Sequence, residues 1–390
     1  MDTKQRDAAY IAGTYGRFPI EIVSGHGSIL TDDTGKDYID LGSGIGVTSF
    51  GCSDPLWVEA VTKQARCFQH TSNLYYTAPC TELAEMLCRK TGMSKVFFSN
   101  SGAEANECAI KAARKYVAMH RDPTYSTIVT LQNSFHGRTL TTLAATGQEH
   151  YHELYQPLTP GFISIPAENV GALWSVCSGN HVAAILVECI QGEGGVIPLS
   201  EEYAKELEEF VQEKDVLLIV DEVQTGNGRT GELYSYMHYG LKPDIVSTAK
   251  GLSGGLPLGA TLLSEKLSSV FQPGDHGSTF GGNPVCCAGA LSVLSRIDDA
   301  LLASVREKGE YLKKTFTGAP GIRSVSGMGL MIGLETEKPA SEVVAKCREG
   351  GVLCLTAKNR VRLLPALNIP MELLQTAVEC ILRAADPLRA

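Results

Sequence analysis

Lys250 is the residue whose type and position first suggest chemistry. It follows an apolar, β-branched run at residues 244–249 and precedes a glycine-dense segment at residues 251–259. A lysine at the end of a buried strand loses hydration, which lowers the pKa of its amine and makes the amine a nucleophile toward aldehydes. Lys250 is therefore a candidate Schiff-base residue, although a lysine in such a place more often extends to the surface.

Two other segments supply complementary groups. Residues 216–220 are an apolar run typical of a strand buried on both faces, and Asp221 follows it. A carboxylate at that end of a strand points into the ligand crevice of an α/β sheet and could face a cationic ring nitrogen, or it could cap a helix or turn. Ser101 and Gly102 lie where a strand meets a long helical stretch, whose first N–H groups could bind a phosphate. Ser101 with Glu104 also fits a capping box, which needs no ligand.

An amine, a carboxylate and a phosphate site are the set that pyridoxal phosphate requires. With these residues the chain resembles the class III aminotransferases, of the fold type I pyridoxal-phosphate family, over essentially its whole length. The most specific strings are residues 99–107, 135–139, 191–195 and 221–226. The resemblance is strongest to the branch that moves the δ-amino group of N2-acetylornithine to 2-oxoglutarate in arginine biosynthesis, giving N-acetylglutamate 5-semialdehyde and glutamate. A histidine-rich motif common in relatives is replaced here by residues 51–55.

The resemblance also implies individual roles. Lys250 and Asp221 are the implied catalytic residues, and the implied cofactor contacts are Ser101, Gly102, Ala103, Phe135, Asp221, Glu222, Val223, Gln224, Lys250 and Thr279. Arg138 would bind the donor α-carboxylate, and Arg362 that of 2-oxoglutarate or glutamate, with Glu193 neutralising Arg362 in the other half-reaction. Ser278 would approach the substrate, and Tyr15 and Asn73 are candidates for contacting the acyl group. Because the family's 278–284 loop crosses to the neighbouring subunit, a homodimer with shared active sites is expected.

Alternating apolar runs and helical stretches predict the architecture. Runs at residues 95–99, 127–131, 182–187, 216–220, 244–247 and 260–263 alternate with helical segments. This order predicts an α/β fold with a mostly parallel central sheet flanked by helices. We expect an N-terminal arm at residues 1–45, a large cofactor domain at 46–285, and a smaller α+β domain formed by residues 286–390 together with the arm.

Composition narrows the class of protein. The chain has 390 residues, a formal net charge of −9 and no basic block, which argues against nucleic acid or an anionic membrane as the main partner. Twelve scattered cysteines favour a reducing compartment, and no run of about 18 apolar residues occurs. We expect a cytoplasmic enzyme whose partners are a small amino donor and 2-oxoglutarate.

Several alternatives stay open at this point. Related sites suit succinyldiaminopimelate, succinylornithine, ornithine or 4-aminobutyrate as donors, and a non-catalytic pyridoxal-phosphate-binding regulator is a further alternative. Residues 226–231 match the dinucleotide motif GxGxxG, and residues 251–255 match the GxSxG of serine hydrolases around Ser253, but neither lies between a strand and a regular helix. His136, His150 and His152 could be imagined as metal ligands, but we expect surface or loop histidines and no metal.

Overall fold

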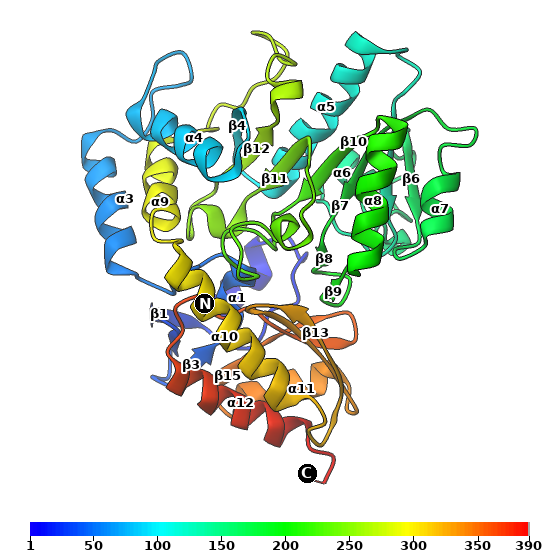
Figure 1. The fold of residues 1–390 in the computed structure, drawn as a ribbon. Coiled ribbons are helices and arrows are strands. Elements are labelled where there is room, and N and C mark those ends of the chain that lie inside the picture. The colour runs from blue at the N-terminus through cyan, green and yellow to red at the C-terminus, as the bar shows by residue number, and fades with distance from the viewer. Residues whose placement is uncertain (389–390) are drawn as a thin grey trace.

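The computed structural model describes residues 1–388. Figure 1 shows that the chain forms a larger and a smaller part. The upper part holds a seven-stranded sheet between helices, and the lower part holds smaller sheets with the C-terminal helices. The fold is therefore α/β, with a smaller α+β part, as the sequence predicts.

The large sheet has the strand order β4-β12-β11-β10-β7-β5-β6. Its strands are β4 (Lys95–Ser99), β5 (Thr127–Leu131), β6 (Phe162–Ile165), β7 (Val182–Val187), β10 (Leu217–Asp221), β11 (Ile245–Thr248) and β12 (Gly259–Leu263). Only β12 is antiparallel to its neighbours, so the other six strands of this sheet run in one direction. Their carboxyl ends consequently meet at one edge.

Helices cover both faces of this sheet because its central strands are apolar on both sides. In β10, Leu218 and Val220 pack in the same core cluster as residues of helices α4 (Ala78–Thr91), α8 (Glu201–Lys214) and α9 (Pro284–Leu294). Leu217 and Ile219 point the other way and pack with helix α5 (Gly102–His120). The remaining elements of this part are α2 (Ser43–Gly46), α3 (Pro55–Cys67), α6 (Leu140–Ala145), η1 (Glu149–Tyr151), α7 (Val170–Ser175), β8 (Ile190–Gln191), β9 (Ile197–Pro198), η2 (Ser235–Tyr239), η3 (Lys250–Leu252) and η4 (Glu265–Leu267).

The smaller part joins the two ends of the chain. One sheet has the order β1-β2-β3-β15, in which the C-terminal strand β15 (Val352–Leu353) pairs in parallel with the N-terminal strand β3 (Asp37–Asp40). The other is antiparallel, in the order β13-β14-β17-β16. The other elements here are α1 (Thr3–Tyr10), β1 (Ile22–His26), β2 (Ile29–Asp32), α10 (Asp299–Phe316), β13 (Ile322–Met328), β14 (Met331–Thr336), α11 (Ala340–Glu349), β16 (Leu355–Ala357), β17 (Arg360–Leu363) and α12 (Met371–Ala385). The domain ranges expected from the sequence stay a prediction.

No helix within residues 1–388 is both long enough and apolar enough to cross a membrane.

Candidate active site

A cavity of about 420 Å³ opens at the edge where the parallel strands end. Its walls include nine residues expected at the site from the sequence, namely Ser101, Gly102, Ala103, Phe135, Arg138, Asp221, Val223, Gln224 and Lys250. They come from segments that follow β4, β5, β10 and β11, so the sheet topology brings together residues that are up to 149 positions apart in the chain.

Lys250 stands two residues beyond the end of β11, at the start of a short 3-10 turn. Its backbone adopts the left-handed φ of +45°, which is strained for a residue with a side chain. Burial lowers the pKa of the Lys250 amine below its usual value, while nearby Glu193 partly opposes this shift. The amine is therefore more readily deprotonated than that of an exposed lysine.

The Asn227 side chain holds the chain just before Lys250. Its amide donates hydrogen bonds to Thr248 Oγ1 at 3.1 Å and to the Ala249 carbonyl at 3.2 Å. Asn227 belongs to the glycine-rich segment 226–231, whose match to a dinucleotide motif is therefore explained by packing beneath the lysine. Ser253, of the hydrolase-like motif, is fully buried and donates to the Cys286 carbonyl at 2.8 Å.

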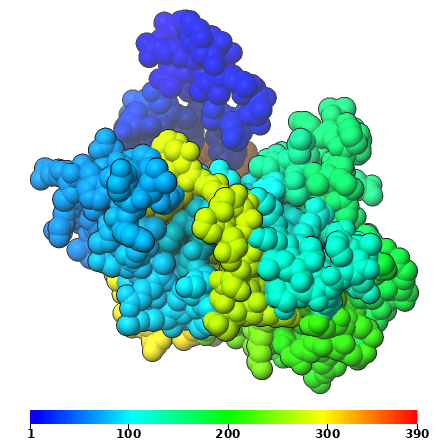
Figure 2. Space-filling model, turned by 90° about the horizontal axis from the view of Figure 1, so that it is seen from above, coloured from blue at the N-terminus to red at the C-terminus, as the bar shows by residue number. Residues whose placement is uncertain are grey.

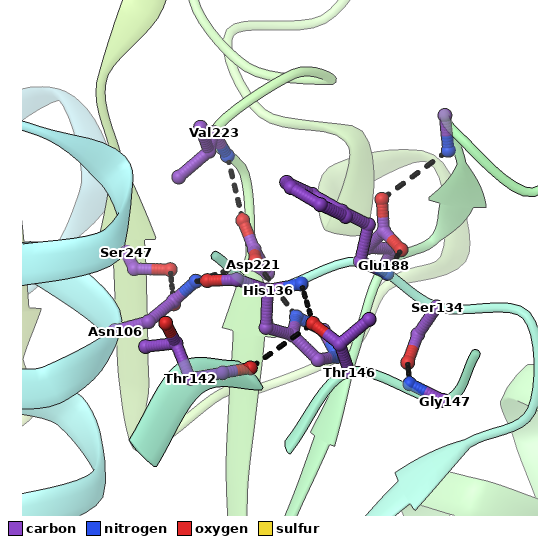
Figure 3. Close-up of polar contacts among 12 residues, drawn as sticks. Asn106, Ser134, His136, Thr142, Thr146, Gly147, Glu188, Asp221, Val223 and Ser247 are labelled. Atoms are coloured by element: carbon purple, nitrogen blue, oxygen red, sulfur yellow. Dashed lines mark hydrogen bonds and ion pairs between the residues drawn. The ribbon is translucent and has the colours of Figure 1, made fainter. Parts of the chain in front are cut away.

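Asp221 is fixed by three donors. Its Oδ2 accepts hydrogen bonds from Asn106 Nδ2 at 2.7 Å and from the His136 ring Nδ1 at 2.8 Å, and Oδ1 accepts from the Val223 N–H at 3.0 Å (Figure 3). Asn106 is itself held by Ser247, whose hydroxyl donates to Asn106 Oδ1 at 2.6 Å. The carboxylate thus has one orientation, facing the cavity.

His136 lies in a loop, which is one of the two places expected from the sequence, but it is not at the surface. Only 2% of His136 is exposed, and its ring contacts Asp221. The spacing of the three histidines gave no sign of this contact, because it joins residues 85 positions apart. Within residues 1–388, no group of three or more His, Cys, Asp or Glu side chains is arranged to hold a metal ion.

The start of α5 forms part of the cavity wall. By helix geometry, the first N–H groups have no carbonyl partner within the helix, and they carry the positive end of its dipole. Ser101 is the N-cap and its hydroxyl accepts from the Glu104 N–H at 3.2 Å. The other half of the expected capping box does not form, because Glu104 accepts instead from the Asn100 N–H at 2.6 Å.

Glu193 and Arg362 form an ion pair beside the lysine. The Arg362 Nη1 donates to Glu193 Oε1 at 2.6 Å and to Gln224 Oε1 at 3.0 Å, and Gln224 Nε2 donates to Glu193 Oε1 at 3.2 Å. Burial alone would raise the pKa of Glu193, but Arg362 holds it below its usual value. The Arg362 Nε is buried and has no hydrogen-bond partner within the described chain, so this guanidinium retains capacity for another acceptor.

Arg138 lies on the other side of the cavity and is exposed. Its guanidinium stacks over the Tyr151 ring, 4.3 Å from the ring centroid, and lies 5.4 Å from the centroid of Phe135. Phe135 presents a partly exposed flat side chain to the cavity. The site thus has two arginines, an exposed one stacked on aromatic rings and a buried one paired with Glu193.

Seven expected residues do not line this cavity. Two of them, Glu193 and Arg362, form the ion pair described above, and the other five lie elsewhere. Glu222 is fully buried and accepts from Thr225, Ser235 and Tyr236, because its side chain points away from the cavity. Ser278 and Thr279 line a separate surface pocket, and Asn73 donates to the carbonyls of Ser278 and Gly281. Tyr15 is 73% exposed in the N-terminal arm. In this chain, Ser278, Thr279, Asn73 and Tyr15 therefore lie at the surface.

Glu188 is a cavity residue that we did not expect. It follows β7 directly, lines the cavity, and is 5% exposed. Burial raises the pKa of Glu188 to about 7, an effect that nearby His136 opposes. A signal was present in the sequence, since Glu188 ends the apolar run 182–187 in the same way as Asp221 ends its own run.

The residues that line the cavity fit pyridoxal phosphate. Lys250 offers an amine with a lowered pKa to an aldehyde, Asp221 offers a fixed carboxylate to a ring nitrogen, and the α5 N-terminus suits a phosphate. Val223 and Phe135 are apolar walls of a size suited to a flat ring.

Comparisons with known proteins agree with this fit. The family model "Aminotransferase class-III" matches residues 10–385. Acetylornithine aminotransferase of Haemophilus ducreyi is 48% identical over 377 residues, covering 96% of each chain, and that of Methanothermobacter thermautotrophicus is 43% identical over 378 residues, covering 95% of each.

Solved structures are similar over nearly the whole chain. An ornithine aminotransferase of Toxoplasma gondii, with pyridoxal phosphate at partial occupancy in its active site, has a TM-score of 0.93 at 32% identity and covers 98% of this chain and 93% of its own. N-acetylornithine aminotransferase of Stenotrophomonas maltophilia has a TM-score of 0.85 at 32% identity and covers 97% of both chains. The family match and the cavity lead to one conclusion, that the chain belongs to the class III aminotransferases and is a pyridoxal-phosphate-dependent transaminase.

Proposed function

We propose that this enzyme transfers the δ-amino group of N2-acetylornithine to 2-oxoglutarate, giving N-acetylglutamate 5-semialdehyde and glutamate, as a step of arginine biosynthesis. The donor follows the relatives that are 42–48% identical and carry the name acetylornithine aminotransferase. Free ornithine is the second candidate donor, because ornithine aminotransferases are among the similar solved structures, with TM-scores up to 0.93.

The observation that carries the proposal is the pair of arginines with unequal partners. Arg138 lines the cavity and is exposed, so it can bind the carboxylate of a donor whose reacting amine lies several bonds away. Arg362 is neutralised by Glu193 in the absence of a second carboxylate. When 2-oxoglutarate enters, its α-carboxylate competes with Glu193 for Arg362, so that one cavity accepts two differently shaped substrates.

The reaction needs few groups from the protein. When bound, pyridoxal phosphate supplies an aldehyde that accepts the donor's amine and a ring that takes up electron density from the reacting carbon. Asp221, fixed by His136 and Asn106, keeps a proton on the ring nitrogen. The Lys250 Nζ would act as the base that takes the proton from the donor's Cδ and as the acid that passes the same proton on.

We also propose that the enzyme works as a homodimer whose subunits share active sites. Large apolar side chains are exposed next to the Ser278–Thr279 loop, with Leu74 87%, Tyr76 100% and Phe280 58% exposed. Figure 2 shows the yellow-green segment around residues 270–285 on the surface, between the light-blue region of α3 and α4 and the cyan region of α5. A partner that covers this surface would bring its own Thr279 to the phosphate site. Sedimentation of the holoenzyme tests this proposal; a monomer with full activity would contradict it.

A cytoplasmic location is the matching proposal for the compartment. All twelve cysteines are free thiols, which suits a reducing environment. Fractionation of cells of the source organism, with detection by antibody, tests it. Recovery outside the cytoplasm would contradict it.

The visible absorbance of the purified holoenzyme tests the proposed reaction. N2-acetylornithine is added without a keto acid, and the band of the lysine-bound cofactor is expected to fade; 2-oxoglutarate should then restore it. Lys250→Ala should lack both the band and the turnover. A band that persists with N2-acetylornithine and fades with ornithine would replace the donor, and substantial turnover by Lys250→Ala would overturn the role of the lysine.

A further inference from the structure

Glu188 joins two loops that reach the active site from different strands. Its Oε2 accepts a hydrogen bond from the Phe135 N–H at 2.9 Å, and its Oε1 accepts from the Gly192 N–H at 3.2 Å. Figure 3 shows Glu188 near His136, in the same group of polar contacts as Asp221. One buried carboxylate thus holds the main chain on both sides of the cavity.

Each of these two loops carries one half of substrate recognition. Phe135 stands three residues before Arg138, and both line the cavity. Gly192 directly precedes Glu193, and its carbonyl accepts from Arg362 Nη1 at 3.5 Å. A displacement of either main-chain segment would therefore move a side chain that meets a substrate carboxylate.

Glu188 is not required by the reaction steps themselves. The proton transfers are assigned to Lys250, the ring nitrogen to Asp221, and the carboxylates to the two arginines. A buried carboxylate is costly unless it accepts hydrogen bonds, and a hydrophobic residue of similar size would pack in the same space. The carboxylate is explained by the hydrogen bonds that it accepts from the N–H groups of Phe135 and Gly192.

We propose that Glu188 is a positioning residue that fixes the Phe135–Arg138 loop and the Gly192–Glu193 turn relative to each other, so that the sites for the two substrate carboxylates keep a constant separation. The inference rests on the proposed assignment of Arg138 and Arg362 to these carboxylates. A second link between the same loops, from Gln191 Nε2 to the Gln132 carbonyl at 2.8 Å, lies away from the cavity and keeps the loops adjacent when Glu188 is replaced.

Two substitutions separate this role from general packing. Glu188→Leu removes both acceptors at similar volume, whereas Glu188→Gln keeps one acceptor and turns an amide N–H₂ toward the other N–H. Asp244→Leu is the matched control. Asp244 is a largely buried carboxylate that accepts from the Leu218 N–H at 3.0 Å, but it directly precedes β11, at the amino ends of the parallel strands and away from the cavity.

Hydrogen exchange and steady-state kinetics of the holoenzymes are the measurements. Glu188→Leu is expected to speed amide exchange in both segments, residues 133–138 and 190–194, by roughly 10-fold or more, and to raise KM for both substrates by a similar factor. Glu188→Gln should open one of the two segments and raise one of the two KM values. Asp244→Leu should change exchange near Leu218 and leave both KM values unaltered.

Unchanged exchange in both segments of Glu188→Leu would overturn the proposal, as would a fall in kcat with both KM values unchanged. The exchange result does not depend on the identity of the donor. If N2-acetylornithine proves not to be the donor, faster exchange in both segments still supports the link, and KM is then measured with the donor that the enzyme accepts. A failure of the proposed function is therefore distinguishable from a failure of this inference.

Discussion

At the scale of single residues, the environment of Lys250 determines whether its amine is reactive. The side chain follows a buried strand and a strained turn, and burial outweighs the attraction of Glu193. A neutral amine is the nucleophile, so a lower pKa gives a larger reactive fraction at any pH below the usual value of 10.5. The same environment has a measurable consequence for pH dependence.

We predict that, in the cofactor-free protein, Lys250 reacts with formaldehyde and borohydride at a lower pH than Lys205, which is on the exposed face of α8. The lowered pKa of Lys250 also makes the stability of the protein depend on pH. Between the folded-state pKa and 10.5 the folded protein binds fewer protons than the unfolded chain, so the free energy of unfolding rises with pH there. Lys250→Met should remove that contribution. Mass spectrometry of the labelled peptides and chemical unfolding at several pH values check both statements, and equal labelling of the two lysines would contradict the first.

At the scale of elements, the N-terminus of α5 and the segment after β10 are packed without space between them. A Cβ atom on Gly102 would lie 2.6 Å from Val223 Cγ1, which is closer than carbon atoms approach in proteins. Only glycine therefore allows Val223 to pack over the start of the helix while both residues line the cavity.

Gly102→Ala is expected to displace Val223 into the cavity and to weaken cofactor binding by about 10-fold, in line with about 1–3 kcal/mol for overpacking. Gly171→Ala in α7 is the control, because a Cβ there meets one atom only at 3.4 Å. Cofactor dissociation constants measured by absorbance titration of the cofactor-free proteins compare the two. Unchanged affinity in Gly102→Ala would show that Val223 can move without consequence.

Local sequence patterns predicted the long buried strands well, but they did not predict the short turn between two strands or the strand at the edge of the sheet. The runs at residues 95–99, 127–131 and 182–187 are strands with the predicted bounds, because long apolar segments leave few alternatives. Residues 328–335 are rich in apolar side chains, yet they contain a turn at Gly329 between β13 and β14. The edge strand β6 (Phe162–Ile165) was missed because it is short and only partly buried.

The site could be predicted only in part, for a related physical reason. Asp221 ends β10, Lys250 stands two residues beyond β11, and both line the cavity. The roles of Asn106 and His136 depend on contacts across 115 and 85 positions of the chain, which strand order creates and spacing does not reveal. Residues at the 278–279 loop face the surface of this chain, so the sequence linked them to the site only through family resemblance.

At the scale of the whole molecule, Arg229 ties the two parts of the structure together. It is 2% exposed, and its Nη1 donates to the Leu330 carbonyl at 3.1 Å and to the Pro365 carbonyl, both in the smaller part. Burial lowers the pKa of Arg229 to about 10, and buried Asp40 opposes the shift. The segment that fixes Asn227 beneath Lys250 is thus also the one that anchors the smaller part.

Arg229→Met should lower the free energy of unfolding by roughly 3–5 kcal/mol, because it leaves a buried carboxylate without its countercharge and two carbonyls without a donor. Arg89→Met is the control, since the Arg89–Glu85 pair is 80% and 59% exposed and such pairs contribute less than about 1 kcal/mol. Urea unfolding measures both. A small effect at Arg229 would indicate that the two parts are held by apolar contacts alone.

The ion pair between Arg362 and Glu193 affects how the rate depends on the two substrates. In the proposed reaction Arg362, now paired with Glu193, binds the carboxylate of 2-oxoglutarate in one half-reaction only, so the cavity would hold its two substrates alternately and never together. Reciprocal plots of rate against one substrate, at several levels of the other, should then be parallel lines. An excess of either substrate would occupy the form of the enzyme meant for its counterpart and slow turnover. The flux is then set by the ratio of nitrogen donor to carbon acceptor in the cell, more than by the amount of either.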